Sequence, residues 1–306
     1  MPMRNLLDLI PFTSEEVEGL ITRAAAYKKG ETSQHLLGQS IGLIFEKVST
    51  RTRVAFEVAV ARLGGHPIFL SFADIQLNRG ETIADTARVL SSYLDALVIR
   101  TYAHEKLVEW ARYATIPVMN GLTDLHHPCQ ALSDLFTIYE RRGDLKGLKL
   151  VYVGDGNNVA HSLMEAGALM GMHVTVAAPE GFSPDPKIVQ EVQEVAQRTG
   201  GKVAIVTNAR EAARMADILY TDVWVSMGQE KEKQERREAF AGYQINAQLV
   251  SRAKADCLVM HCLPAYREEE ITSEVMDATH SIIFDQAANR LPMHQAILEM
   301  CVDGRH

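Results

Sequence analysis

Short apolar runs alternate with amphipathic segments along almost the whole sequence. Residues 41–45 read as a buried strand, after which Phe56, Val60 and Leu63 share one helical face that the glycine pair 64–65 closes. Strands that alternate with helices in this way are typical of a parallel sheet covered on both sides. The pattern therefore predicts an α/β fold.

The same alternation continues in two series of similar length, separated by the polar, glycine-bearing segment 141–147. Further strands are predicted at residues 96–100, 116–119, 150–153, 174–176, 203–206, 218–220, 257–260 and 282–284, and helices at 105–113 and at the C-terminus, where Met293, Ala296, Ile297 and Met300 share a face. The chain has 306 residues, more than one average domain. We therefore expect two doubly wound parallel-sheet domains with an active-site cleft between them.

Composition excludes several classes of protein. No apolar stretch approaches the roughly 20 residues needed to cross a bilayer, and the first eight residues lack the apolar core of a secretory signal, so a cytoplasmic location is expected. The net charge of −8 argues against a nucleic-acid partner, whose binders usually display a basic face. The cysteines lack Cys-x-x-Cys spacing and the histidines are dispersed, which indicates reduced thiols and no metal; the cysteines are Cys129, Cys257, Cys262 and Cys301.

The strongest functional motif is the run Ser49-Thr50-Arg51-Thr52-Arg53, which directly follows a predicted strand and opens a helix. A helix N-terminus offers free backbone N–H groups and the positive end of a dipole, so it favours an anion. The hydroxyls and guanidinium groups add further donors, and arginine can grip phosphate with two hydrogen bonds. Helix capping explains one hydroxyl but not this density of donors. We therefore predict an anion site.

Three more polar residues of the first half follow predicted strands or open helices. His127 precedes Pro128, which suits the first position of a helix, and could donate to a carbonyl oxygen, while Gln130 could bond a carboxamide. Arg100 ends an otherwise apolar strand, so it is expected near the ligand, although a surface ion pair is the alternative. For His127, a plain capping or packing role stays equally open.

In the second half, three segments follow predicted strands. Residues 154–159 resemble a dinucleotide fingerprint, but Val159 stands where the third glycine is required, and the paired asparagines suit a small polar ligand better. Asp222 and Ser226 could bind the ammonium and carboxylate of one zwitterion, with a plain polar turn as the alternative. In the segment 261–264, Cys262 is either a buried packing residue or a functional thiol. Residues 230–237 are predicted to form a solvated helix face.

Taken together, these motifs resemble the transcarbamoylase family over nearly the whole chain. Ser-Thr-Arg-Thr-Arg, His-Pro-x-Gln and His-Cys-Leu-Pro occur in the family order, and residues 79–86 look like the family's mobile loop and the helix after it. Asp-x-x-x-Ser-Met-Gly at 222–228, together with His-Cys-Leu-Pro at 261–264, is the pattern of the ornithine branch. Cys129 occupies a position of His-Pro-x-Gln that the family varies freely.

The resemblance implies which residues bind each substrate. Residues 1–140 and the C-terminal helix 290–306 match the carbamoyl phosphate domain, and residues 148–289 match the ornithine domain. The implied carbamoyl phosphate ligands are Ser49, Thr50, Arg51, Thr52, Gln76, Arg100, His127, Gln130, Cys262, Leu263 and Arg290, of which Thr52, Arg100, His127 and Cys262 match catalytic positions. The implied ornithine ligands are Asn158, Asp222, Ser226 and Met227.

The resemblance also implies the reaction and the assembly. The δ-amine of ornithine attacks the carbamoyl carbon directly through a tetrahedral intermediate, and no cofactor is needed. Because the carbamoyl phosphate residues lie almost wholly in the first half of the chain and the ornithine residues in the second, we expect carbamoyl phosphate to bind first. Family members form catalytic trimers, and Gln76 looks like the glutamine that reaches a site across a subunit boundary. Three alternatives stay open: transfer to another amine such as aspartate, putrescine or an acylated ornithine, an NAD-dependent oxidoreductase, and a non-catalytic ligand-binding regulator.

Overall fold

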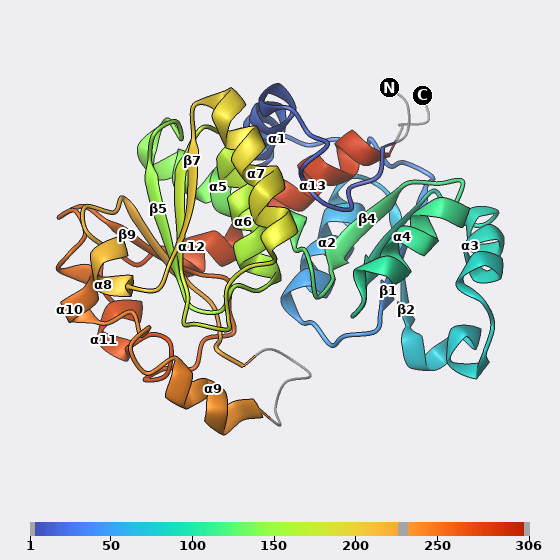
Figure 1. Cartoon of the computed structure of the whole chain (residues 1–306). Helices are drawn as coiled ribbons and strands as arrows, with labels where there is room; N and C mark the ends of the chain where they lie inside the picture. The colour runs from blue at the N-terminus through green and yellow to red at the C-terminus, as the bar shows by residue number, and fades with distance from the viewer. Residues whose placement is uncertain (1–3, 226–231, 303–306) are drawn as a thin grey trace. The chain divides into compact units, whose positions relative to one another are not determined.

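The computed structural model describes residues 4–225 and 232–302 of the chain. Contacts between Cα atoms divide the chain into two compact units. The first unit comprises Met1–Phe136 and Asn289–His306, and the second comprises Thr137–Ala288. Each unit contains one parallel sheet with interleaved helices (Figure 1). The predicted α/β fold of two parallel sheets is thereby confirmed.

The sheet of the first unit has four parallel strands in the order β2-β1-β3-β4. The strands are β1 (Ser40–Phe45), β2 (His66–Ser71), β3 (Ala96–Arg100) and β4 (Val118–Leu122). The chain reverses its winding direction between the neighbouring strands β1 and β3. Ligands of such sheets bind outside the carboxyl ends of the strands at this reversal. Residues 46–53 follow β1 and Arg100 ends β3, so both sequence motifs lie at this position.

Helices cover both faces of this sheet. Their bounds are α1 (Ser14–Lys28), α2 (Arg51–Arg62), α3 (Ile83–Ser91), α4 (His104–Tyr113), α5 (Pro128–Arg142) and α13 (Arg290–Cys301), with short 3-10 turns η1 (Phe72–Asp74) and η2 (Gln76–Arg79). On one face, Leu97 and Ile99 of β3 pack with Ala87, Leu107 and Trp110 of α3 and α4. The C-terminal helix α13 packs against α1 and α2. It thereby brings Arg290 into the first unit although the residue lies far along the chain.

The sheet of the second unit has five parallel strands in the order β7-β6-β5-β8-β9. The strands are β5 (Lys149–Val153), β6 (His173–Ala177), β7 (Lys202–Val206), β8 (Ile218–Thr221) and β9 (Leu258–His261). The helices are α6 (Asn158–Leu169), α7 (Pro186–Thr199), α8 (Ala209–Ala212), α9 (Lys233–Ala239), α10 (Ala247–Val250), α11 (Ser273–Met276) and α12 (Ile283–Ala288). The winding reverses between β5 and β8. The loops that follow β5, β8 and β9 therefore form the expected ligand position of this unit.

Alternation along the central strand β5 assigns the helices to two faces. Val151 and Val153 belong to a buried cluster with Ala213, Leu249 and Ile283, which come from the side of α8, α10 and α12. The intervening residues of β5 point to the opposite face, where α6 and α7 pack against β6 and β7 (Figure 1). Within the described residues, no helix is long and apolar enough to cross a membrane.

One local prediction was wrong. The strand predicted at residues 282–284 is instead the start of α12, where Ile283 and Gln286 are buried three residues apart and Phe284 is 63% exposed. A short apolar run does not distinguish a strand from a buried helix turn. The solvated helix face predicted at 230–237 is confirmed for the residues that the structure describes: residues 232–235 and 237 are exposed, and Arg236 is the buried member among them, paired with Asp155. Residues 230 and 231 lie outside the described residues. In addition, strand β2 was not predicted.

Candidate active site

The N-terminus of α2 presents donors that the helix itself does not use. Thr50 is the residue before the first turn, and its hydroxyl makes no capping hydrogen bond. The hydroxyl of Ser49 accepts from the backbone N–H of Thr52 at 3.3 Å. The first turn contains no acidic residue, so its positive dipole end stays uncompensated within the helix. This geometry suits an anion.

The two arginines of this turn differ in their surroundings. The Nε atom of Arg53 lies 2.9 Å from a carboxylate oxygen of Glu57, and its guanidinium lies 3.4 Å from the ring centre of Phe69. The half-buried side chain of Arg51, by contrast, makes no hydrogen bond or ion pair with the residues that the structure describes. Arg51 is therefore the arginine of this turn that can bind an external anion.

Arg290 joins two other predicted ligands directly. Its guanidinium donates from Nη1 to the side-chain oxygen of Gln130 at 2.6 Å and from Nη2 to the hydroxyl of Thr52 at 3.0 Å. Its Nε donates to Nε2 of His294 at 3.2 Å. Burial and the neighbouring Arg290 hold the pKa of His294 well below its ordinary value, so the imidazole is neutral and can accept this hydrogen bond. The structure therefore brings Thr52, Gln130 and Arg290 together.

His127 is buried among positive charges. Burial lowers the pKa of His127 well below its ordinary value, and the nearby guanidinium groups of Arg290, Arg100 and Arg51 lower it further. The imidazole is therefore neutral and carries one N–H donor. A neutral donor such as His127, close to guanidinium groups, favours a ligand that combines a carbonyl oxygen with a negative charge.

One predicted ligand of the first unit, Gln76, has no hydrogen bond to the other predicted ligands among the described residues. Gln76 opens the 3-10 turn η2, and its side chain is exposed. No contact between Gln76 and the cluster of Thr52, Gln130 and Arg290 occurs among the described residues. The prediction that Gln76 binds carbamoyl phosphate therefore stays a prediction.

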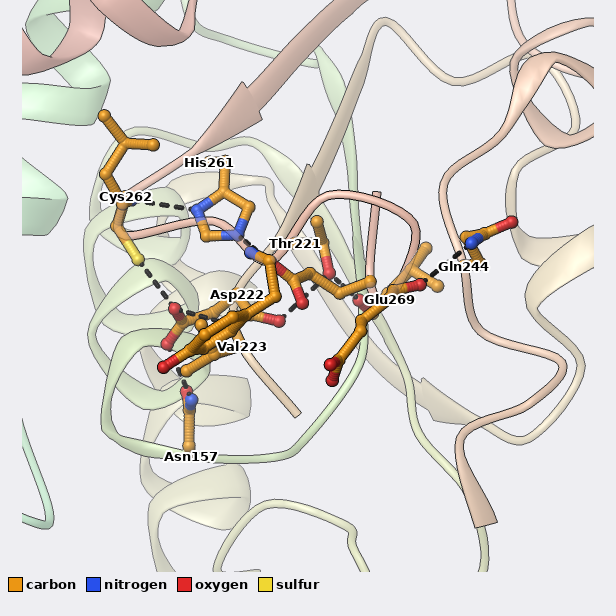
Figure 2. Close-up of polar contacts among 12 residues, drawn as sticks. Asn157, Thr221, Asp222, Val223, Gln244, His261, Cys262 and Glu269 are labelled. Atoms are coloured by element: carbon orange, nitrogen blue, oxygen red, sulfur yellow. Dashed lines mark hydrogen bonds and ion pairs between the residues drawn. The ribbon is translucent and has the colours of Figure 1, made fainter. Parts of the chain in front are cut away.

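In the second unit, Asp222 and Cys262 lie together at the ends of neighbouring strands. The Cys262 thiol donates to Oδ1 of Asp222 at 3.0 Å (Figure 2). The other carboxylate oxygen of Asp222 accepts from the amide nitrogen of Asn157 at 2.9 Å. Asp222 is 7% exposed, and Cys262 is half-buried. The structure thus places two of the predicted substrate ligands in contact.

A buried histidine fixes the loop that carries Cys262 and Leu263. Nδ1 of His261 accepts from the backbone N–H of Leu263 at 2.8 Å, and its Nε2 lies 3.0 Å from a carboxylate oxygen of Glu270. Because Nδ1 acts as acceptor, Nε2 carries the proton that Glu270 accepts. Leu263 adopts φ of +60°, an uncommon backbone conformation that this hydrogen bond helps to hold.

The loop after β5 differs from a dinucleotide-binding turn. The side-chain oxygen of Asn157 accepts from the backbone N–H groups of Val159 and Ala160 at 3.0 and 3.2 Å, so these donors of α6 are already used. A Cβ atom on Gly156 would lie 2.2 Å from the backbone nitrogen of Pro184, so packing accounts for this glycine. These contacts disfavour the NAD-dependent oxidoreductase alternative. Asn158, a predicted ornithine ligand, is the first residue of α6 and is half-buried.

Two predicted ligands, Ser226 and Met227, lie outside the described residues.

Asp222, His261 and Cys262 form a group whose possible metal-ligand atoms lie within 4.8 Å of one another. Both ring nitrogens of His261 are already hydrogen-bonded, so His261 would have to release Leu263 or Glu270 to bind an ion.

Sequence reasoning missed several supporting residues. Asn157 was visible in the asparagine pair, since asparagine is favoured before a helix, but nothing in the sequence indicated that it contacts Asp222. His261 adjoins Cys262 in the motif, but no sequence pattern indicated that Glu270 contacts His261. The sequence placed His294 on the predicted C-terminal helix and gave no indication of its role. Each contact depends on tertiary structure.

Comparisons with known proteins agree with this geometry. Residues 4–140 match the carbamoyl-P binding domain of aspartate/ornithine carbamoyltransferase, and residues 146–301 match its Asp/Orn binding domain. The chain therefore belongs to the aspartate/ornithine carbamoyltransferase family, and the predicted family resemblance is confirmed.

Individual relatives cover nearly the full length of the chain. It is 50% identical over 305 residues to the anabolic ornithine carbamoyltransferase of Pyrococcus furiosus, covering 98% of this chain and 97% of that protein. It is 52% identical over 305 residues to the ornithine carbamoyltransferase of Halalkalibacterium halodurans, covering 98% and 96%. A solved structure of the Pyrococcus furiosus enzyme matches with a TM-score of 0.93 and 51% identity, covering 96% of each chain.

Proposed function

We propose that this chain transfers the carbamoyl group of carbamoyl phosphate to the δ-amine of L-ornithine, giving L-citrulline and phosphate. The observation that carries the proposal is the contact of Arg290 with Thr52 and Gln130, together with the neutral His127 whose pKa is lowered by burial and by the nearby guanidinium groups of Arg290, Arg100 and Arg51. Carbamoyl phosphate is a dianion with a carbonyl oxygen, which matches this combination of cations and a neutral donor. Full-length relatives that are named ornithine carbamoyltransferases support the same reaction.

In the proposed mechanism, the first unit holds carbamoyl phosphate. The helix N-terminus and Arg51 bind the phosphate, together with Ser49 and Thr50. Thr52, Arg100 and His127 stabilise the carbonyl oxygen, on which negative charge grows during attack. Each well-placed donor of this kind lowers the barrier by about 3 kcal/mol. Gln130 binds the carbamoyl NH₂ group.

The residues of the second unit hold the nucleophile. The Asp222 carboxylate pairs with the α-ammonium group of ornithine, and Asn158, Ser226 and Met227 complete the contacts to its amino-acid end. The neutral δ-nitrogen attacks the carbamoyl carbon beside Cys262 and gives a tetrahedral intermediate. The carbon–oxygen bond to phosphate then breaks, and the nitrogen loses its proton to the departing phosphate. Much of the rate comes from holding both substrates in attack geometry.

A panel of amines tests the substrate assignment. The protein is mixed with carbamoyl phosphate and, separately, ornithine, N-acetylornithine, aspartate or putrescine, and both phosphate and the ureido product are assayed. Ornithine is expected to give stoichiometric phosphate and citrulline, because Asp222 needs a free α-ammonium group as partner. If N-acetylornithine or putrescine is turned over in preference to ornithine, the proposed substrate is wrong and the preferred amine is the substrate of the enzyme.

We also propose that the chain works as a homotrimer in the cytoplasm. The exposed side chain of Gln76 supports a role at a neighbouring copy, as the family resemblance implies. All four cysteines are free thiols, which suits a reducing compartment. Light scattering at working concentration tests the assembly, with about three times the 34.0 kDa chain mass, or a multiple of this, as the expected result.

A further inference from the structure

The amide of Asn157 is fixed in one orientation by three donors. Its side-chain oxygen accepts from the N–H groups of Val159 and Ala160 and also from the hydroxyl of Tyr152, at 3.2 Å. Burial and the nearby Asp222 carboxylate raise the pKa of Tyr152 well above its ordinary value, so the phenol keeps its proton and stays a donor. A flipped amide would turn its NH₂ group toward all three donors, which excludes that orientation.

The fixed orientation directs the NH₂ group of Asn157 to one oxygen of Asp222. Nδ2 lies 2.9 Å from Oδ2 of Asp222 (Figure 2). The other oxygen, Oδ1, accepts from the backbone N–H of Val223 at 2.8 Å and from the Cys262 thiol at 3.0 Å. An ionised carboxylate has about four acceptor sites, two on each oxygen. With respect to residues 4–225 and 232–302, these contacts leave one acceptor site, on Oδ2 beside Asn157.

We propose that Asn157 is a positioning residue for ornithine, acting through Asp222. Its NH₂ group orients the carboxylate and leaves the remaining acceptor site of Oδ2 to the α-ammonium group of the substrate. Asn157 thereby links the N-terminus of α6, which it caps, to the carboxylate that selects the substrate. The inference rests on the proposed function, since it assigns ornithine to Asp222.

Asn157→Asp separates the two roles of the residue. Aspartate is as good as asparagine before a helix, so the hydrogen bonds from Val159, Ala160 and Tyr152 can persist. The NH₂ donor is replaced by an oxygen that faces Asp222, and two carboxylates at this distance repel each other. A change in ligand binding without loss of folding therefore reports on the group that faces Asp222 and not on the cap of α6.

The test measures binding of L-norvaline, which has the amino-acid end of ornithine but lacks the reactive amine, in the presence of saturating carbamoyl phosphate. At pH 8, Asn157→Asp should weaken norvaline binding at least about tenfold. Binding of carbamoyl phosphate alone should stay within about twofold of the wild-type value. The ornithine KM should rise by a similar factor as the norvaline Kd, while kcat changes less.

The pH dependence distinguishes positioning from a general structural effect. As the pH falls, the introduced carboxylate of Asn157→Asp and the carboxylate of Asp222 gain a shared proton, which restores a hydrogen bond between the two side chains. The ratio of variant to wild-type norvaline Kd should therefore fall toward one between pH 8 and pH 6. A structural defect would not be repaired by acid.

Asn208→Asp is the matched control, because Asn208 caps α8 in the same unit by accepting from the N–H of Glu211. This control should bind both ligands like the wild type. Norvaline binding by Asn157→Asp within twofold of wild type at every pH, or an equal loss for norvaline and carbamoyl phosphate, would overturn the inference.

Should Asn157→Asp not fold, Asn157→Ser keeps a capping hydroxyl without the reach to Asp222, and it should weaken norvaline binding at every pH. Unchanged binding by that variant would equally refute the assignment. Citrulline formation by the wild-type protein is measured in parallel. Its absence refutes the proposed function itself, whereas citrulline formation combined with unchanged variant binding refutes only the role of Asn157.

Discussion

The guanidinium of Arg290 donates from Nη2 to the hydroxyl of Thr52 at 3.0 Å, although 238 residues separate the two in the sequence. The same guanidinium holds Gln130 through Nη1. One planar group therefore sets the relative positions of the N-terminus of α2 and the first turn of α5. Because a guanidinium is planar and its donors have fixed geometry, the two hydrogen bonds together restrict how these segments can move relative to each other.

Removing the Arg51 guanidinium at the N-terminus of α2 should weaken anion binding strongly. Arg51→Ala is expected to lower kcat/KM for carbamoyl phosphate by about 100-fold or more, because a charge-assisted contact to phosphate is lost. Steady-state kinetics with carbamoyl phosphate as the varied substrate measure the effect. Arg53→Ala is the control: its guanidinium already contacts Glu57 and Phe69, so its effect on kcat/KM should be much smaller. Unchanged kinetics in Arg51→Ala would refute the anion site.

The buried histidines should make unfolding take up protons in mild acid. His127 and His294 have folded-state pKa values well below 6.5, because burial and neighbouring cations disfavour the imidazolium. Unfolding raises both values to the ordinary one, so the unfolded chain binds more protons below about pH 6.5. The stability contributed by the neutral form is complete above this pH and falls as the pH drops toward the folded-state values, by at most about 1.4 kcal/mol per pH unit for each histidine.

Proton uptake on unfolding at pH 5.5 measures this linkage directly. His294→Gln should reduce the uptake by about one proton per chain relative to wild type. His66→Gln is the control substitution outside the buried site, since His66 begins β2 at an exposed position. Equal uptake by wild type and His294→Gln would show that His294 is protonated in the folded protein.

Two neighbouring buried carboxylates should have different roles. Asp222→Asn should raise the ornithine KM by about 100-fold, because the α-ammonium group loses its counter-ion, and it should leave the carbamoyl phosphate Kd nearly unchanged. Asp155→Asn is the matched control. Asp155 pairs with the buried Arg236 at 2.8 Å, so its loss should lower the melting temperature more than it changes the ornithine KM. Equal effects of Asp222→Asn on both substrates would indicate a folding role instead.

The sequence was sufficient for the fold class and for the elements that carry the motifs. Strands and helices with strong apolar periodicity, such as β3 with Arg100 at its end, were predicted nearly residue for residue. The prediction was wrong at 282–284, where three apolar residues fit a strand and a helix turn equally well. The contacts of Asn157 with Asp222 and of Arg290 with Thr52 were not predictable, since they join segments whose distance in space depends on the whole chain.

The order of substrate binding follows from the charges of the proposed site. The guanidinium groups of Arg51, Arg100 and Arg290 act together on His127, and they should repel the cationic side chain of ornithine until an anion neutralises them. The attacking nitrogen must also come within about 3–3.5 Å of the carbamoyl carbon, so part of its binding energy depends on carbamoyl phosphate being present. Carbamoyl phosphate is therefore expected to bind first.

Calorimetry of the free enzyme tests this order. Carbamoyl phosphate should bind on its own, whereas ornithine alone should produce little heat at concentrations up to its KM. Norvaline lacks the δ-ammonium group, so it should depend less strongly on prior binding of carbamoyl phosphate if charge repulsion sets the order. Tight ornithine binding to the free enzyme would refute the ordered scheme. An equal dependence of ornithine and norvaline on carbamoyl phosphate would keep the order but assign it to contacts with carbamoyl phosphate and not to the arginine charges.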